Sequence, residues 1–354
     1  MKEIENLIMN TRLTTTELRR NYHISLLTNT RSRTREINNA VINYSTNNEF
    51  FNDQEFGEVL RGIQEANFYV EPFFNELEFI QTILKEAYYK NKRFVYNLSR
   101  NGTHIGKKSL IPSFCDLMSI PYTGSNALII SVSRAKYIYT KYLENHNVKV
   151  PKSWVYDPIN GWLGQNKPIP NTKILIKPMH ESASIGLSKT SIMIFDQHAE
   201  SEIMKQCEED TLPILVQEFI SGFECEVPVL ISQKPYAMNP VGISISNENN
   251  LGEDILTYTN SYNDDYNFYL LEREFPDSII QTIQHAAIQV ASLIGLKAYG
   301  RIDFRINNQG IPYLMDIAAT PYTTKHSSFA FAFGNMGLEY HDIYNTIIGL
   351  SGNR

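Results

Sequence analysis

Cysteine, net charge and long apolar runs are all scarce in this chain. Its 354 residues include three cysteines, Cys115, Cys207 and Cys225, and none belongs to a Cys-x-x-Cys pair. Scattered thiols in odd number argue against a disulfide scaffold and against a zinc knuckle. The 32 basic and 38 acidic residues leave a net charge of −6, which argues against a dedicated nucleic-acid-binding protein.

Apolar runs are short throughout, and Ala127–Ile130 is typical of the longest. A membrane-spanning helix needs roughly 18 or more consecutive apolar residues, so we expect no membrane association. The segment Thr11–Arg35 has the Ser, Thr and Arg content of a transit peptide, but it contains Glu17 and a strand-like stretch from Tyr22. No apolar stretch of the signal-peptide kind follows the first Met, so we expect a soluble cytoplasmic protein.

Hydrophobic residues make up 42% of the chain and charged residues 20%, which are ordinary values for a globular protein. A length of 354 residues predicts two or three domains. In the first part, strand-like segments at Tyr22–Leu27 and Arg93–Asn97 flank helical spacing at Phe56–Gln64 and Glu76–Tyr89. This order predicts an α/β layer with a parallel sheet.

The remainder of the chain predicts more strands than helices. Helical spacing covers Ser109–Met118 and Ser131–Asn145. Strand-like segments follow at Ser153–Tyr156, Lys173–Pro178, Leu215–Phe219, Glu226–Ile231, Gly300–Ile306 and Pro312–Ile317. The long polar segment Asn247–Phe268 is typical of a lid or a binding loop, because structureless loops of that length are otherwise uncommon.

Two segments offer groups that suit a nucleotide. Lys177 ends a strand, and a loop of small residues up to Gly186 can hold phosphates through backbone N–H groups and one ammonium. The same pattern also fits a lysine that caps a hairpin. In Gln217–Glu224 a strand opens into a connector that suits a purine edge, with Glu224 as an acceptor for ribose hydroxyls. A strand that ends at Gly222 beside solvated acids is the alternative.

Arg301 and Asp303 lie two residues apart and therefore share one face of a strand. Asp316 lies on the next predicted strand, after the turn Asn307–Gly310, so we expect the two aspartates side by side. Adjacent carboxylates repel each other unless a cation lies between them, and Mg²⁺ prefers such oxygen ligands. Two acids in separate hydrogen bonds are the alternative.

Other catalytic patterns are absent from the sequence. Gly102–Ser109 resembles a P-loop, but three residues separate its glycines where four are needed, and an extra lysine precedes the serine. There is no Gly-x-Ser-x-Gly segment, and the eight histidines do not cluster along the chain.

Together and in this order, these segments resemble the ATP-grasp superfamily, and within it the D-alanine–D-alanine ligase-like branch. The similarity runs from about Phe94 to Ser328 and includes Ile120–Ser125. It implies an α/β ATP-grasp fold, with an N-terminal Rossmann-like α/β domain over residues 1–126. Two α+β subdomains, over residues 127–212 and 213–354, would clasp ATP. A homodimer is a further expectation from the resemblance.

The resemblance also implies roles for particular residues. ATP would be bound by Lys136, Lys177, Glu181, Ser184, Gln217, Glu218, Ile220 and Glu224. Asp303 and Asp316 would be the Mg²⁺ ligands, and Lys177, Ser184 and Arg301 the catalytic residues. In that scheme Arg301 stabilises the acyl phosphate and the tetrahedral oxyanion, and Ser327 contacts the carboxylate of the second substrate.

Several positions depart from the family pattern. Ala318 stands where the last metal motif has Asn, and Asp316 stands where it has Glu. Ser261 replaces the lid lysine, Tyr322 replaces a glycine after the final proline, and Ser182 replaces a glycine of the phosphate loop. The His-Gly…Gly-Glu loop of the first-substrate site is missing, so D-alanine is a poor guess for the substrate.

The implied reaction is ATP-dependent formation of a peptide or amide bond between small amino-acid-like substrates through an acyl phosphate. Ligation to a carrier-protein thiol is one alternative. A non-catalytic nucleotide-binding paralogue is another, and Ala318 and Ser261 point toward it.

Basic residues gather in two loops near the expected first-substrate site. Arg33 lies among alternating arginines after the first strand, and Arg100 precedes the paired Lys107 and Lys108. Since arginine suits bidentate capture of carboxylate or phosphate, Arg33 and Arg100 are candidates for binding a substrate with an extra negative charge. A solvated face, or pairing with acids such as Glu36, is the alternative.

Overall fold

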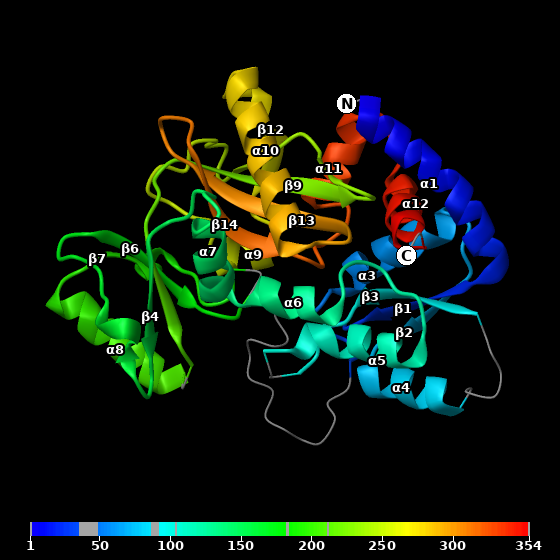
Figure 1. The fold of residues 1–354 in the computed structure, drawn as a ribbon, viewed down its shortest axis with the longest axis horizontal. Helices are drawn as coiled ribbons and strands as arrows, with labels where there is room; N and C mark the ends of the chain where they lie inside the picture. Colours follow the sequence, from blue (N-terminus) through cyan, green and yellow to red (C-terminus); the bar gives the residue numbers. More distant parts are fainter. Residues whose placement is uncertain are drawn as a thin grey trace.

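The structure is a computed structural model, and it describes residues 2–34, 49–85, 92–102, 105–181, 184–210 and 212–352. Three β-sheets follow one another along the chain, with helices packed around them (Figure 1). Glu36, Ser182 and the end of the helix expected up to Tyr89 lie outside the described residues.

The N-terminal sheet is parallel, in the order β2-β1-β3, as the alternation of strands and helices predicts. Its strands are β1 (His23–Thr28), β2 (Val70–Phe73) and β3 (Arg93–Leu98), with helices α3 (Asp53–Glu65) and α4 (Glu76–Lys85) between them. A capping box starts α3, because the Asn52 side chain accepts from the N–H of Glu55 and the Glu55 carboxylate accepts from the N–H of Asn52.

A long helix that the sequence did not predict, α1 (Lys2–Asn21), precedes this sheet. It packs along α12 (Tyr340–Gly352), so the first and last helices lie side by side (Figure 1). The two backbones are close, since a Cβ added at Gly349 would lie 2.7 Å from the Cβ of Thr11. Thr11 and Thr15 are buried in the contact face of α1 and interrupt its apolar spacing, which hides the helix in the sequence.

The central sheet is antiparallel, in the order β5-β4-β8-β6-β7. Its strands are β4 (Ser153–Asp157), β5 (Gly161–Trp162), β6 (Lys173–Pro178), β7 (Ile192–Ile194) and β8 (Ile214–Glu218). Helix α8 (Gln197–Asp210) packs on this sheet through Ile203 and Cys207. Because β8 pairs with β4 and β6, a domain boundary at residue 213 separates a strand from its own sheet. The strand pairing therefore favours a boundary between the central and C-terminal parts that lies after Glu218.

The C-terminal sheet is also antiparallel, in the order β12-β11-β9-β13-β14, with β10 paired to β9. Its strands are β9 (Phe223–Ile231), β10 (Pro235–Ala237), β11 (Val241–Ser244), β12 (Asn267–Leu270), β13 (Ala298–Ile306) and β14 (Pro312–Ala318). Helix α10 (Asp277–Ile294) covers one face, and α11 (Ser328–Asn335) leads into α12. The expected lid is the connection from β11 to β12, which includes the short helix α9 (Tyr258–Tyr262).

Three further helices, α5 (Leu110–Met118), α6 (Ala127–Arg134) and α7 (Lys136–Glu144), join the N-terminal and central parts. The sequence predicted one helix over Ser131–Asn145, and the structure divides it at Ala135, which has φ −91° and ψ 72°. Arg134 and Lys136 thus lie on either side of a break. No helix in the described ranges has the length and apolar character needed to cross a membrane.

Candidate active site

A cavity of about 250 Å³ is lined by residues from the N-terminal part and from both antiparallel sheets. Many of the predicted site residues line it: Arg100, Lys136, Lys177, Glu181, Ser184, Glu224, Arg301, Asp303 and Asp316. Ala318 and Ser261, the two departures from the metal and lid patterns, line it as well. The structure therefore brings together residues that are more than 200 positions apart in the sequence.

Three carboxylates lie in register across neighbouring strands at one wall of this cavity. Asp303 on β13 is paired with Asp316 on β14, as predicted, and with Glu226 on β9. Arg301 donates from Nε and Nη2 to the two oxygens of Asp303 at 2.7 and 2.8 Å, and its Nη1 is 3.1 Å from Glu226. Sequence reasoning missed Glu226. Its spacing was the available signal, because Glu226 lies two residues after Glu224 and therefore on the same face of the strand.

The electrostatics of this wall follow from its burial. Burial, together with the neighbouring acids Glu226 and Asp316, outweighs the opposing effect of Arg301 and raises the pKa of Asp303 to about 7. For Arg301, burial acts to lower the pKa, but Asp303 and Glu226 outweigh it and the pKa is raised. For Asp316, burial raises the pKa, and Lys136 and Lys177 outweigh that effect and lower it. The wall therefore carries more negative charge than Arg301 alone neutralises.

This donor set fits a magnesium ion. Asp303 and Asp316 are aligned oxygen donors, and Glu226 Oε2 is buried without a hydrogen-bond partner among the described residues. Asp316 also accepts from the Tyr139 hydroxyl at 3.1 Å. Within those same ranges no three His, Cys, Asp or Glu side chains are gathered closely enough to form a complete metal site by themselves. A magnesium ion at this position would be bound by two carboxylates of the chain and by further ligands from substrate or water.

Two buried lysines, Lys136 and Lys177, lie near Asp316. Lys136, the first residue of α7, donates to the Glu181 carbonyl at 2.5 Å and lies 3.6 Å from Asp316 Oδ1. Lys177, at the end of β6, donates to the Met315 carbonyl at 3.4 Å. Burial, helped by Lys136, lowers the pKa of Lys177 to about 8. Two neighbouring ammonium groups in a cavity suit the charge of a polyphosphate.

Glu224 lines the same cavity and is fixed by Arg305. Arg305 Nη1 donates to Glu224 at 2.6 Å and to the Asp254 carbonyl at 3.0 Å, and Nη2 donates to the carbonyls of Gly222 and Gly252. Arg305 was not predicted, although it lies two residues after Asp303 on the same strand face.

Not every predicted nucleotide residue reaches the cavity. Gln217, Glu218 and Ile220 do not line it, and the Gln217 side chain donates to the Ser153 hydroxyl at 3.0 Å. Their role in adenine binding stays a prediction.

A smaller cavity adjoins the first, and five residues line both: Glu226, Ser261, Tyr266, Arg301 and Tyr322. Ser327 lines this second cavity, where its hydroxyl donates to the Thr324 carbonyl at 2.6 Å and caps α11 by accepting from the N–H of Ala330. Its predicted contact with a substrate carboxylate is untested.

Arg33 lines neither cavity. Its guanidinium lies over the rings of Phe56 and Phe74 and 4.0 Å from Asp53. The structure instead places Arg31 at the second cavity, with its guanidinium 4.3 Å from the centre of the Tyr262 ring.

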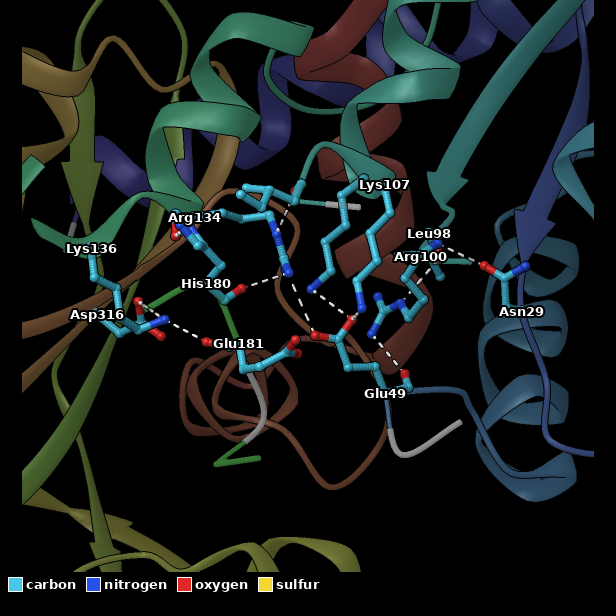
Figure 2. A network of polar contacts seen from close by, with 12 residues as sticks. Asn29, Glu49, Leu98, Arg100, Lys107, Arg134, Lys136, His180, Glu181 and Asp316 are labelled. Atoms are coloured by element: carbon cyan, nitrogen blue, oxygen red, sulfur yellow. Dashed lines mark hydrogen bonds and ion pairs between the residues drawn. The ribbon is translucent and has the colours of Figure 1, made fainter. Parts of the chain in front are cut away.

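Arg100 belongs to a buried network around Glu49 that sequence reasoning did not find (Figure 2). Lys107 and Lys108 lie 3.4 and 3.5 Å from Glu49 Oε2. Arg134 lies 3.7 Å from Glu49 Oε1, and Arg100 donates to the Glu49 carbonyl at 3.2 Å. We call these five residues the Glu49 cluster. Its members come from four separate segments, and no local spacing in the sequence signals their meeting.

Residues 168–349, more than half of the chain, match the family model described as D-ala D-ala ligase C-terminus. The chain belongs to this family. The D-alanine–D-alanine ligase of Bordetella petrii is 23% identical over 246 residues, covering 69% of this chain and 72% of the relative. That of Syntrophotalea carbinolica is 26% identical over 247 residues, covering 69% and 74%.

Among solved structures, the D-alanine–D-alanine ligase from Bacillus anthracis complexed with ATP superposes with a TM-score of 0.67. The match has 14% sequence identity and covers 93% of this chain and 97% of that one, so it confirms the ATP-grasp fold. The family and its relatives also confirm the predicted enzyme class, an ATP-dependent ligase that forms C–N bonds.

Proposed function

We propose that this ATP-dependent carboxylate–amine ligase joins two small amino-acid-like substrates through an acyl phosphate. One observation carries the proposal. A single cavity holds two buried lysines, Lys136 and Lys177, together with Arg301 and the paired carboxylates of Asp303 and Asp316. Such a set provides charge for phosphoryl transfer and for the oxyanion of amine attack within one enclosed site.

The side chains divide the work by position. Lys136 and Lys177 bind the ATP phosphates and neutralise charge on the transferring group, and Glu224 accepts from the ribose hydroxyls. Asp303 and Asp316 would hold Mg²⁺, which supplies further positive charge to the phosphates when bound. Arg301, oriented by Asp303 and Glu226, stabilises the tetrahedral oxyanion when the amine attacks the acyl carbon.

The segment from β11 to β12 acts as the lid. Asp254 lies 3.2 Å from Lys189, and the N–H of Tyr258 donates to the Leu187 carbonyl at 3.0 Å, so the segment closes against the central part. We expect closure of this segment to keep water away from the acyl phosphate.

A non-catalytic nucleotide-binding protein is the second candidate. Ala318 lines the cavity and has no side-chain atom that can bind a metal, which is the observation in favour of this candidate. A carrier-protein thiol as acceptor, a homodimer and a cytoplasmic location remain predictions from the sequence.

The test is a screen of ADP formation over pairs of amino acids of both configurations, in the presence of Mg²⁺, with products analysed by mass spectrometry. A ligase gives ADP, phosphate and condensed product in equal amounts, and Lys177→Ala abolishes all three without unfolding the protein. ATP binding without turnover for any pair favours the non-catalytic candidate. A mass increase on a carrier protein identifies a thiol acceptor.

A further inference from the structure

The Glu49 cluster buries four cationic side chains around one carboxylate (Figure 2). Glu49 is fully buried, and no cation of the cluster is more than 8% exposed. Burial lowers the pKa of Lys108 well below its usual value, and the other three cations act in the same direction against Glu49. Among the residues that the structure describes, one carboxylate faces four cationic groups, and buried positive charge in excess of negative charge is unfavourable. The cluster is therefore suited to receive further negative charge.

Arg100 is the best-defined part of this site. Its guanidinium packs against the rings of Phe51 and Tyr322, 4.7 and 4.6 Å from their centres, and the two rings also meet edge to face. The Tyr322 hydroxyl donates to the Glu49 carbonyl at 2.8 Å, which fixes that ring. Nε of Arg100 donates to the Leu98 carbonyl, while Nη2 is buried without a hydrogen-bond partner among the described residues. A planar guanidinium that is held in place and has an unused N–H donor suits the binding of a carboxylate or a phosphate.

The cluster lies in the same cavity as Arg301, but on the N-terminal side. Arg100, Lys108 and Arg134 line that cavity. Figure 2 shows Lys136 and Asp316 on one side of Glu181 and the cluster on the other. The backbone between them accepts from both groups, since Arg134 donates to the His180 carbonyl at 2.7 Å and Lys136 to the Glu181 carbonyl. The phosphate lysines and the cluster are thus two separate positive regions.

We propose that the substrate whose carboxylate is activated carries a second anionic group, a carboxylate or a phosphate, and that the Glu49 cluster binds it. This inference rests on the proposed function. The terminal phosphate of ATP is the other source of anionic oxygens in this cavity, and the experiment separates the two.

Binding is measured by titration calorimetry on the full chain with Mg²⁺ and a non-hydrolysable ATP analogue. The probes are matched pairs in both configurations: aspartate and asparagine, glutamate and glutamine, phosphoserine and serine. At least one acidic probe is expected to bind ten times more tightly than its neutral partner. Arg100→Met and Lys108→Met should each remove most of that preference and leave affinity for the analogue unchanged. Lys205→Met, which removes an exposed charge, is the matched control and should change neither.

Equal binding of acidic and neutral partners, or no binding of any acidic probe, overturns the proposal. So does a loss of affinity for the ATP analogue in both variants, which would assign the cluster to the terminal phosphate. Circular dichroism confirms that each variant is folded, and the two substitutions lie on different segments, so one misfolded variant leaves the other informative. Because the measurement requires no turnover, failure of the ligase reaction with the acidic preference intact would contradict only the proposed function.

Discussion

Arg301 contacts two carboxylates that come from neighbouring strands, and both contacts form within the protein itself. Its orientation is therefore set before any substrate binds, which is what electrostatic stabilisation of an oxyanion requires. In the proposed reaction Glu226 acts through Arg301, as a positioning residue. Asp303, although paired with an arginine, has a raised pKa because it is buried and because it lies between two further acids.

Asp303→Asn is expected to raise the Mg²⁺ concentration for half-maximal phosphate release about tenfold or more, because it removes one of two aligned carboxylates. Magnesium titrations of turnover measure this, with the exposed Asp277→Asn as control.

Ala318→Asn is expected to leave turnover intact or to lower the Mg²⁺ requirement, since it adds an oxygen donor to the cavity wall. The same titrations measure it. A large loss of turnover would show that the space beside Asp316 serves another purpose.

Glu49→Gln is expected to lower the free energy of unfolding by about 3 kcal/mol at pH 7, because it leaves buried cations without their carboxylate. Burial acts to raise the pKa of Glu49, but the four cations of the cluster outweigh it and hold the pKa well below its usual value. A depressed pKa contributes stability above the unfolded-state pKa and loses it as the pH falls through the folded-state pKa. The difference in the free energy of unfolding between Glu49→Gln and the wild type should therefore become smaller below about pH 4.

Urea unfolding at several pH values checks this, with the exposed Glu208→Gln as control. A difference that stays constant down to acid pH would mean that packing, and not charge, is lost.

How far the sequence predicts the site depends on how local each contact is. Arg301, Asp303 and Asp316 were predictable, because strand alternation and one short turn bring them together. The Glu49 cluster was not, because its contacts join residues 49, 100, 107, 108 and 134 and depend on how several elements pack. Arg33 was predicted to contact the substrate because it follows the first strand closely in the sequence. In the structure its neighbour Arg31 is the residue that reaches the second cavity.

At the level of elements, helix α9 connects the lid with the N-terminal part. The Tyr262 ring lies under the Arg31 guanidinium, and Asp264 lies 3.2 Å from His326 Nδ1. These contacts hold the lid over both cavities. Cation–π contacts of this kind contribute about 0.5–1 kcal/mol when exposed, so the contact of Tyr262 with Arg31 is a modest part of the closure proposed for this segment.

Tyr262→Ala is expected to raise the ratio of phosphate released to product formed above one, because a loosened lid admits water to the acyl phosphate. Comparing both products in the same reaction measures the ratio. Tyr69→Ala, which removes an exposed tyrosine, is the control. A ratio that stays at one in the Tyr262 variant would show that other contacts close the site.

Two elements show why secondary structure was only partly predictable. Strands β6, β13 and β14 have apolar residues and turns of the usual kind, and the sequence located them. The break at Ala135 has no glycine or proline to mark it. Hydrogen bonds from the side chains of Arg134 and Lys136 to backbone carbonyls of the central part of the chain stabilise it.

At the scale of the whole molecule, the largest core joins both ends of the chain. Ile4 and Ile8 of α1, Phe56 and Ile63 of α3, and residues of α12 lie in one buried cluster with the N-terminal sheet. The close approach at Gly349 is part of this core, where an added Cβ would also lie 3.0 Å from the Thr11 carbonyl oxygen.

Gly349→Ala is therefore expected to lower the free energy of unfolding by about 1–3 kcal/mol, since overpacking forces two helices apart. The midpoint of urea unfolding measures the effect. Gly334→Ala in α11 is the matched control, because its added methyl meets no atom within 4 Å, and it should be neutral or slightly stabilising. Equal midpoints for the two variants would show that α1 moves aside easily.

The pairing of α1 with α12 has a consequence for synthesis on the ribosome. Chains begin to fold from the N-terminus as they emerge, yet the main partner of the apolar face of α1 is α12. That face lacks this partner while roughly three hundred residues are still being added. The nascent chain is thus exposed to aggregation for most of its translation, and a chaperone that shields the first helices has the longest time in which to act.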